Sequence, residues 1–142
     1  MQSSRWPVYA SAVLMAGGLA WIIKIAVIVA TNGRIITTGP AAFLMSAGLV
    51  LLPLGAAGVG ASLARRNHVA VRALAALVAV VVLIAFTVAL GSSGAALFRN
   101  RGPAYAAEEA GILLAGVVWF GLGAAALARL RRAGATTDGA TI

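Results

Sequence analysis

The sequence contains no cysteine and a single histidine, His68. The lack of cysteine excludes disulfide bonds, thiolate metal sites, iron–sulfur clusters and cysteine nucleophiles. One histidine per chain cannot supply two-histidine haem ligation or a histidine-clustered metal site. We therefore expect no cofactor and no bound metal.

Acidic residues are also scarce, since three Asp and Glu stand against eleven Lys and Arg, for a net charge of +8. Such a balance can indicate nucleic-acid binding. Here the arginines lie in small groups between long apolar runs instead of forming one patch or stripe. That distribution is typical of a membrane protein that sets its orientation with positive charge, so we expect no nucleic-acid partner.

Catalytic motifs are missing as well. The sequence has no G-x-S-x-G, no H-E-x-x-H and no phosphate-binding loop with a lysine. Glu108 and Glu109 are adjacent, and successive residues of a helix point about 100° apart. They therefore do not form a facing carboxylate pair, and we predict that the protein is not an enzyme.

Hydrophobic residues, in contrast, make up 62% of the 142 residues, charged residues only 10%, and the mean hydropathy is +1.02. A soluble domain is about half apolar and about a quarter charged. A domain of this size buries only about two-thirds of its surface. A lipid bilayer must cover the rest, so the composition predicts an all-α integral membrane protein.

Four segments reach the length of about 20 apolar residues that a membrane-spanning helix needs. Turn-forming residues separate them, and Gly91-Ser-Ser-Gly94 is expected to end the third. We predict one domain, residues 1–142, with a flexible cytoplasmic tail at 133–142. The predicted spans are about 8–30, 42–64, 70–90 and 104–128.

The basic residues outside the spans predict the orientation. One side would hold Arg5, Arg65, Arg66, Arg72, Arg129, Arg131 and Arg132, and the other Arg34, Arg99 and Arg101. Loops rich in arginine remain in the cytoplasm. We therefore expect both termini in the cytoplasm, with the chain in a plasma membrane of the bacterial type.

An internal repeat is visible when the chain is shifted by 63 residues, which aligns the second span with the fourth. Gly39-Pro-Ala41 then lies over Gly102-Pro-Ala104, and two later glycine pairs also match. The first and third spans match only weakly. The pattern favours a 2+2 parallel duplication of helical hairpins, which is common in membrane proteins, over chance matches in an Ala/Gly/Leu-rich chain.

Small residues spaced four apart let two helix backbones approach closely in lipid. Such pairs either close the four-helix bundle or face a second copy or another protein, and spacing alone does not separate these interpretations. The candidate packing pairs are Ala16 with Ala20, Ala57 with Ala61, Gly111 with Ala115, and Gly121 with Ala125.

Three charged residues, Lys24, Glu108 and Glu109, fall inside predicted spans, where a charge is costly and usually paired. Lys24 lies six residues before Ala30, hence about 9 Å from the end of its helix at 1.5 Å per residue. The two glutamates lie four and five residues after the start of theirs, hence about 6–8 Å from the same membrane face. The charges therefore share one depth.

Glu108 is the favoured partner of Lys24, because it shares a stripe with Gly111 and Ala115, as Lys24 does with Ala16 and Ala20. Glu109 would then face another helix, a partner or the outer interface. The repeat replaces the three charged residues by uncharged ones, so symmetric packing did not require them.

Three interpretations of this polar site remain open. The residues form a structural ion pair, or they bind or move a proton, an ion or a small polar solute, or both extend to the lipid headgroups. Trp21, one turn before Lys24, either stacks on the ammonium or simply packs.

Together these features predict a small non-enzymatic membrane protein that acts through self-association or as an accessory or assembly subunit of a membrane complex. The alternative is a small oligomeric transporter or channel that uses the Lys–Glu site. The expected partners are the lipid bilayer and either a second copy or another membrane protein.

Overall fold

The computed structural model describes residues 5–99 and 103–138, and throughout these residues the chain forms helices joined by short connections. The four helices are α1 (Trp6–Ala30), α2 (Gly39–Leu63), α3 (Val69–Phe98) and α4 (Ala104–Asp138). No strand occurs in the described ranges. The predicted all-α fold with four long helices is thus confirmed.

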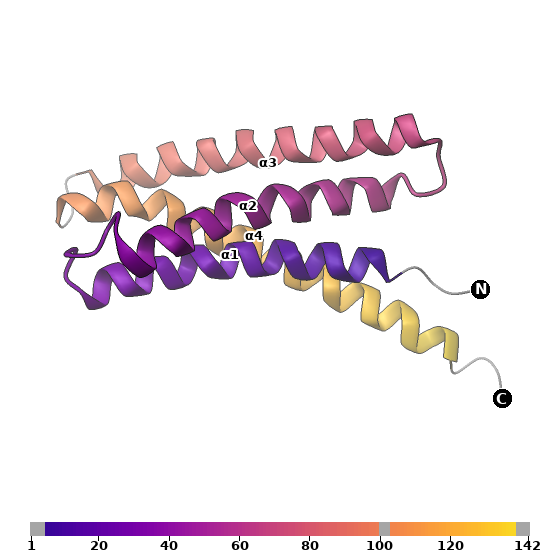
Figure 1. The fold of residues 1–142 in the computed structure, drawn as a ribbon, viewed down its shortest axis with the longest axis horizontal. Coiled ribbons are helices and arrows are strands. Elements are labelled where there is room, and N and C mark those ends of the chain that lie inside the picture. Colours follow the sequence, from indigo (N-terminus) through magenta and orange to yellow (C-terminus); the bar gives the residue numbers. More distant parts are fainter. Residues whose placement is uncertain (1–4, 100–102, 139–142) are drawn as a thin grey trace.

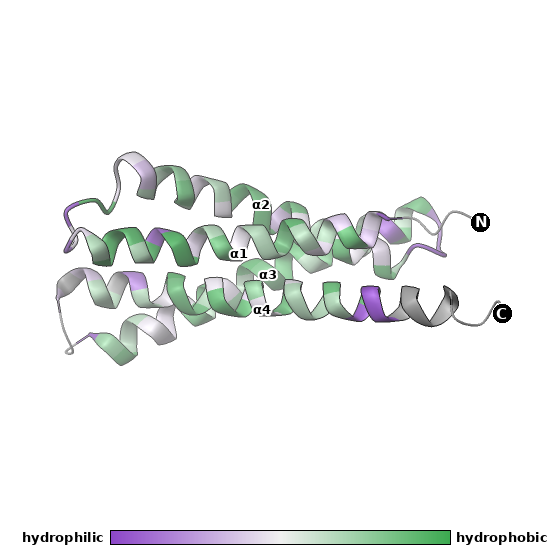
Figure 2. Cartoon of the chain, turned by 90° about the horizontal axis from the view of Figure 1, so that it is seen from below, coloured by the Kyte–Doolittle hydropathy of each residue, from purple (hydrophilic) through white to green (hydrophobic). Residues whose placement is uncertain are grey.

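All four helices are long and apolar enough to cross a membrane. Even the shorter two, α1 and α2, have 25 residues each, or about 37 Å at 1.5 Å per residue, and exceed the roughly 30 Å of a bilayer core. Figure 2 shows hydrophobic residues along most of each helix, whereas hydrophilic residues gather toward the ends and connections.

The helices form an antiparallel bundle in which α1 packs against α2 and α4, and α3 packs against the same two helices. Both termini and the α2–α3 connection lie at one end of the bundle (Figure 1). We call this the terminal end. The α1–α2 connection and the start of α4 lie at the opposite end.

The core sits around α1, which carries the most buried residues, whereas only Leu83 and Gly94 of α3 are buried. Two tryptophans, Trp21 and Trp119, anchor this core. The main cluster consists of Leu14, Trp21, Leu52, Ala56, Leu83, Ala115 and Trp119, and a second consists of Ile25, Ile28 and Ala41 at the opposite end. Many large apolar side chains are exposed on the outside of the bundle.

The connection between α1 and α2 depends on a left-handed backbone at Asn32 and Gly33, with φ of 50° and 74°. The Gly33 N–H donates to the Ile28 carbonyl, which closes the end of α1. A Cβ at Gly33 would lie 2.7 Å from the Tyr105 ring. Glycine therefore serves both the turn and the packing of α4 beside it.

The predicted end of the third helix at Gly91-Ser-Ser-Gly94 is wrong, because α3 continues to Phe98. The hydroxyls of Ser92 and Ser93 donate to the Ala89 carbonyl at 2.9 and 2.8 Å, which is compatible with helix. The two glycines bring α3 against α4, since a Cβ at Gly94 would lie 2.6 Å from the Gly111 nitrogen. They are packing residues and not helix breakers.

The fourth helix also extends beyond the predicted span and continues to Asp138. Part of the segment predicted as a flexible tail is therefore helical, and residues 139–142 lie outside the described residues.

Pro53 lies inside α2 without ending it.

Candidate functional site

Lys24 of α1 and Glu109 of α4 form an ion pair inside the bundle. The Lys24 Nζ donates to both carboxylate oxygens of Glu109, at 2.8 Å to Oε1 and 2.5 Å to Oε2. The side chains are only 4% and 9% exposed. The prediction that Lys24 lies level with Glu109 is confirmed, and the interpretation in which both side chains extend to the headgroups is wrong. The Glu108 side chain lies outside the described residues.

The preferred partner of Lys24 was wrongly predicted as Glu108, because the face of α4 that meets α1 was misassigned. Gly116 and Gly123, seven and fourteen residues after Glu109, both face α1. A Cβ at Gly116 would lie 3.1 Å from the Gly18 carbonyl oxygen, and a Cβ at Gly123 would lie 2.7 Å from the Met15 nitrogen. Residues seven apart lie on the same face of a helix. Glu109 therefore lies on the face of α4 that Gly116 and Gly123 direct at α1.

Gly111, which the prediction grouped with Glu108 and Ala115 in one stripe of α4, packs against α3 and not against α1. Gly111 packs against Gly91 and Gly94 of α3, and Ala115 lies in the main core with no exposed surface. On α1, Ala20 is buried but Ala16 is exposed. The predicted Ala16–Ala20–Lys24 stripe is therefore not one buried contact surface.

The last predicted packing pair, Gly121 with Ala125, faces outward. Both residues are exposed, and a Cβ at Gly121 would have no neighbouring atom within 4 Å. The structure thus distinguishes the small residues inside the bundle from those outside it, which spacing alone could not do. Ala20, Gly111 and Ala115 pack inside the bundle, whereas Gly121 and Ala125 form a small-residue surface on its outside.

Trp21 packs in the core, with 4% exposure. Its indole lies directly against Gly48 of α2, where no side chain would fit. The indole N–H points to the Met45 carbonyl oxygen at 3.4 Å. The contacts of Trp21 therefore support the packing role over stacking on the ammonium.

A second polar contact, which sequence reasoning missed, joins α3 to α4. The Trp119 indole N–H donates to the Thr87 hydroxyl at 2.9 Å, and Phe86 meets the same indole edge-on with ring centroids 5.9 Å apart. Thr87 corresponds to Lys24 in the repeat. As an isolated polar residue in an apolar span, it could have been predicted from the sequence to bond a polar group on a neighbouring helix.

A cavity of about 440 Å³ borders the ion pair at the opposite end from the termini. Glu109 is the one charged residue among its described lining residues, and apolar side chains such as Ile28, Leu97 and Leu113 form most of the wall. No buried side-chain nitrogen or oxygen of the described residues lacks a hydrogen-bond partner. The cavity thus adds no further charged group to the site.

Among the side chains that the structure describes, the site offers one charge pair, Lys24 with Glu109, and no further charged group. Across residues 5–99 and 103–138, no set of three or more His, Asp or Glu side chains is placed to hold a metal ion. No protein-family model, curated protein or solved structure matches the chain. Function must therefore be inferred from the geometry of the chain itself.

Proposed function

We propose that the protein inserts its four helices into a plasma membrane of the bacterial type, with both termini in the cytoplasm, and acts without enzymatic activity. It would act through self-association or as an accessory or assembly subunit of a membrane complex. The helix lengths and apolar surfaces support insertion. The arginine-rich termini and α2–α3 connection share one end of the bundle, which supports the orientation.

The observation that carries the proposal is where the polar and small residues lie. The charged pair is inside the bundle, and one pair of small residues is on its outside. Lys24 and Glu109 satisfy one another inside the chain, which leaves neither charge facing the lipid. Gly121 and Ala125 remain on the outside with open space beside Gly121. An exposed small-residue pair on a spanning helix allows a further helix to approach closely.

We also infer that the two hairpins arose by duplication. A two-fold axis along the membrane normal would exchange α1 with α3 and α2 with α4. Gly48 contacts α1, and its repeat counterpart Gly111 contacts α3. Gly60 contacts α3, and its counterpart Gly123 contacts α1. The neighbours of these two glycine pairs exchange as the axis requires. The third pair does not, because Gly58 meets Ala10 of α1 whereas its counterpart Gly121 meets no atom within 4 Å. The Lys24–Glu109 pair likewise occupies only one of the two equivalent interfaces.

Cysteine scanning tests the proposal well because the chain has no native cysteine. Gly121→Cys places a thiol on the small-residue surface. Ile84→Cys is the matched control, because Ile84 is exposed on α3 four residues before the large residue Val88 and lies near the depth of Gly121 in the register that joins Trp119 to Thr87. Both variants are oxidised in membranes, and the native mass of the detergent-purified wild type is measured in parallel.

A disulfide-linked dimer with Gly121→Cys but not with Ile84→Cys supports self-association through this surface. A native mass that includes another protein, lost in Gly121→Leu, supports the accessory-subunit form. A single-chain mass together with equal behaviour of the two cysteine variants contradicts the proposal.

One observation favours the alternative, a small oligomeric transporter or channel: the cavity beside the ion pair reaches Glu109. Vesicles containing the purified protein provide the test. Proton or ion flux that Lys24→Met and Glu109→Gln each abolish, in variants that remain folded, supports transport. Flux indistinguishable from empty vesicles contradicts the alternative.

A further inference from the structure

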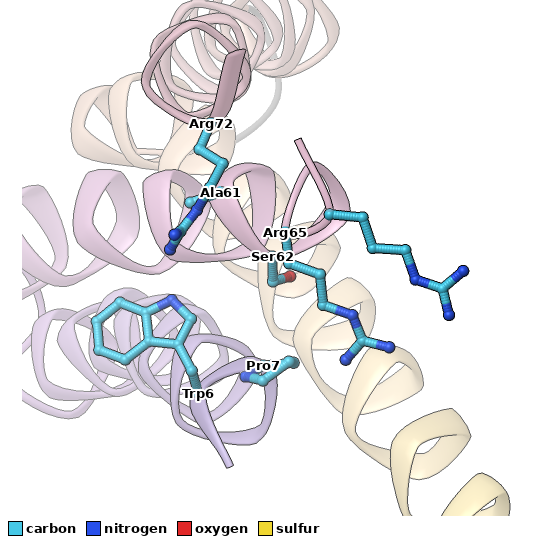
Figure 3. Close-up of a pocket in the computed structure, with 7 residues that line it drawn as sticks. Trp6, Pro7, Ala61, Ser62, Arg65 and Arg72 are labelled. Carbon is cyan, nitrogen blue, oxygen red and sulfur yellow. The ribbon is translucent and has the colours of Figure 1, made fainter. Parts of the chain in front are cut away.

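At the terminal end of the bundle, three arginines line one hollow on the outside of α2. This basic hollow has a volume of about 430 Å³ and is lined by Trp6, Pro7, Ala61, Ser62, Arg65, Arg66 and Arg72. In Figure 3 the Arg72 side chain extends from α3 across Ala61 toward the indole of Trp6, whereas Arg65 extends from the end of α2 away from Trp6. Residues of α1, the end of α2 and α3 therefore line the hollow, and Arg72 is the arginine directed at Trp6.

Electrostatics make the basic hollow a site for an anion. The arginines contribute three positive charges, and their planar groups match the geometry of phosphate oxygens. Arg72 lies in the first turn of α3, which contains no acidic residue, so the positive end of the helix dipole adds to the field. Glu108 and Glu109 lie near the start of α4, at the other end of the bundle.

The walls of the basic hollow indicate that the anion belongs to a lipid. Trp6 is the first residue of α1 and Ala61 lies two residues before the end of α2, so both lie at the depth expected of a membrane–water interface. Trp6 is 55% exposed, and tryptophan is enriched at headgroup depth. Basic pockets between helix ends on the cytoplasmic side are suited to anionic headgroups.

We propose that the basic hollow binds the headgroup phosphate of an anionic phospholipid beside Arg72, with Arg65 and Arg66 adding positive charge and Trp6 packing at the level of the glycerol. The inference rests on the proposed membrane insertion. It goes beyond the general attraction of arginine-rich loops to a membrane, because it assigns one lipid to one place.

Native mass spectrometry of the full chain in mild detergent tests this site, with phosphatidylglycerol and phosphatidylcholine of identical acyl chains added in equal amounts. We expect phosphatidylglycerol to be retained preferentially. Arg65→Gln/Arg72→Gln should lower that preference by about tenfold or more, because it removes the hydrogen bonds from Arg72 to the charged phosphate together with a neighbouring positive charge. Arg65→Lys/Arg72→Lys should retain most of it because the charge remains.

Arg131→Gln/Arg132→Gln is the matched control, because it removes the same charge from the same end of the bundle but outside the hollow. Equal losses in the two glutamine double variants, or equal retention of the two lipids by the wild type, would overturn the inference. Full displacement of the lipid by inorganic phosphate would assign the site to a soluble anion and overturn the proposal that it binds a lipid.

Membrane insertion is checked separately by alkaline carbonate extraction. Release of the protein from membranes would overturn both the proposed insertion and the lipid site. Retention in membranes without any preference for phosphatidylglycerol would overturn the lipid site alone.

Discussion

Gly18 of α1 and Gly116 of α4 face each other so closely that a Cβ at Gly18 would collide with the backbone of α4. A Cβ at Gly18 would lie 2.7 Å from the Gly116 carbonyl oxygen and 2.5 Å from the Phe120 nitrogen, and both of these are backbone atoms. The contact lies on the α1–α4 interface that also holds Lys24 and Glu109. Close backbone packing of α1 on α4 therefore accompanies the ion pair.

Gly18→Ala should destabilise the protein by about 1–3 kcal/mol, because the added methyl group forces two backbones apart. The measurement is the free energy of unfolding in mixed detergent micelles. Gly121→Ala is the control, since a Cβ there meets no atom within 4 Å, and alanine has the higher helix propensity. Comparable destabilisation by the two substitutions would contradict the assigned interface.

The contact of α3 with α4 can be tested with two glycines that touch each other. A Cβ at Gly111 would collide with the backbone of Gly91, whereas a Cβ at Gly91 itself would point into open space. We expect Gly111→Ala to lower the thermal unfolding midpoint and Gly91→Ala to leave it unchanged or raise it. A lower midpoint for Gly91→Ala alone would show that the register of α3 on α4 is different.

Thr87→Val removes the acceptor of the Trp119 indole N–H while keeping the side-chain shape. A donor left unpaired in apolar surroundings costs about 1–3 kcal/mol, which should appear as a lower free energy of unfolding. Thr87→Ser keeps the hydroxyl and should recover most of the stability. If serine were as harmful as valine, packing of the Thr87 methyl group and not the hydrogen bond would be responsible.

The sequence was sufficient to predict the four helices, because long apolar runs and the turn residues between them are local signals. It also predicted the common depth of Lys24 and the glutamates, which follows from counting residues along a helix. It did not predict the partner, because adjacent positions differ by about 100° and the orientation of α4 depends on both of its neighbours. The spacing of Glu109, Gly116 and Gly123 by seven residues was the pattern that would have identified Glu109.

Glycine was the other source of error. The Gly91–Gly94 segment has the composition of a turn, but in the structure its glycines let α3 approach Gly111 while the helix continues. Tertiary packing decides between these roles, and it is not encoded in the local sequence. The same limit applies to Gly121 and Ala125, whose spacing matches that of Gly111 and Ala115 although only the latter pair is buried.

The central claim is that Lys24 and Glu109 neutralise each other inside the bundle, so that neither can be removed alone without leaving a buried charge. Removing one partner leaves the other charge buried and should cost about 3–5 kcal/mol, whereas removing both should be nearly neutral. Glu108→Gln is the matched control, because the Lys24–Glu109 pair stays intact.

The most direct measurement is therefore a double-mutant cycle on the free energy of unfolding in mixed micelles, using Lys24→Met, Glu109→Gln and the two together. The ion pair predicts that each single variant is strongly destabilised, that the double variant returns to within about 1 kcal/mol of the wild type, and that Glu108→Gln has little effect. Additive losses in the double variant, or a loss with Glu108→Gln as large as with Glu109→Gln, would contradict it.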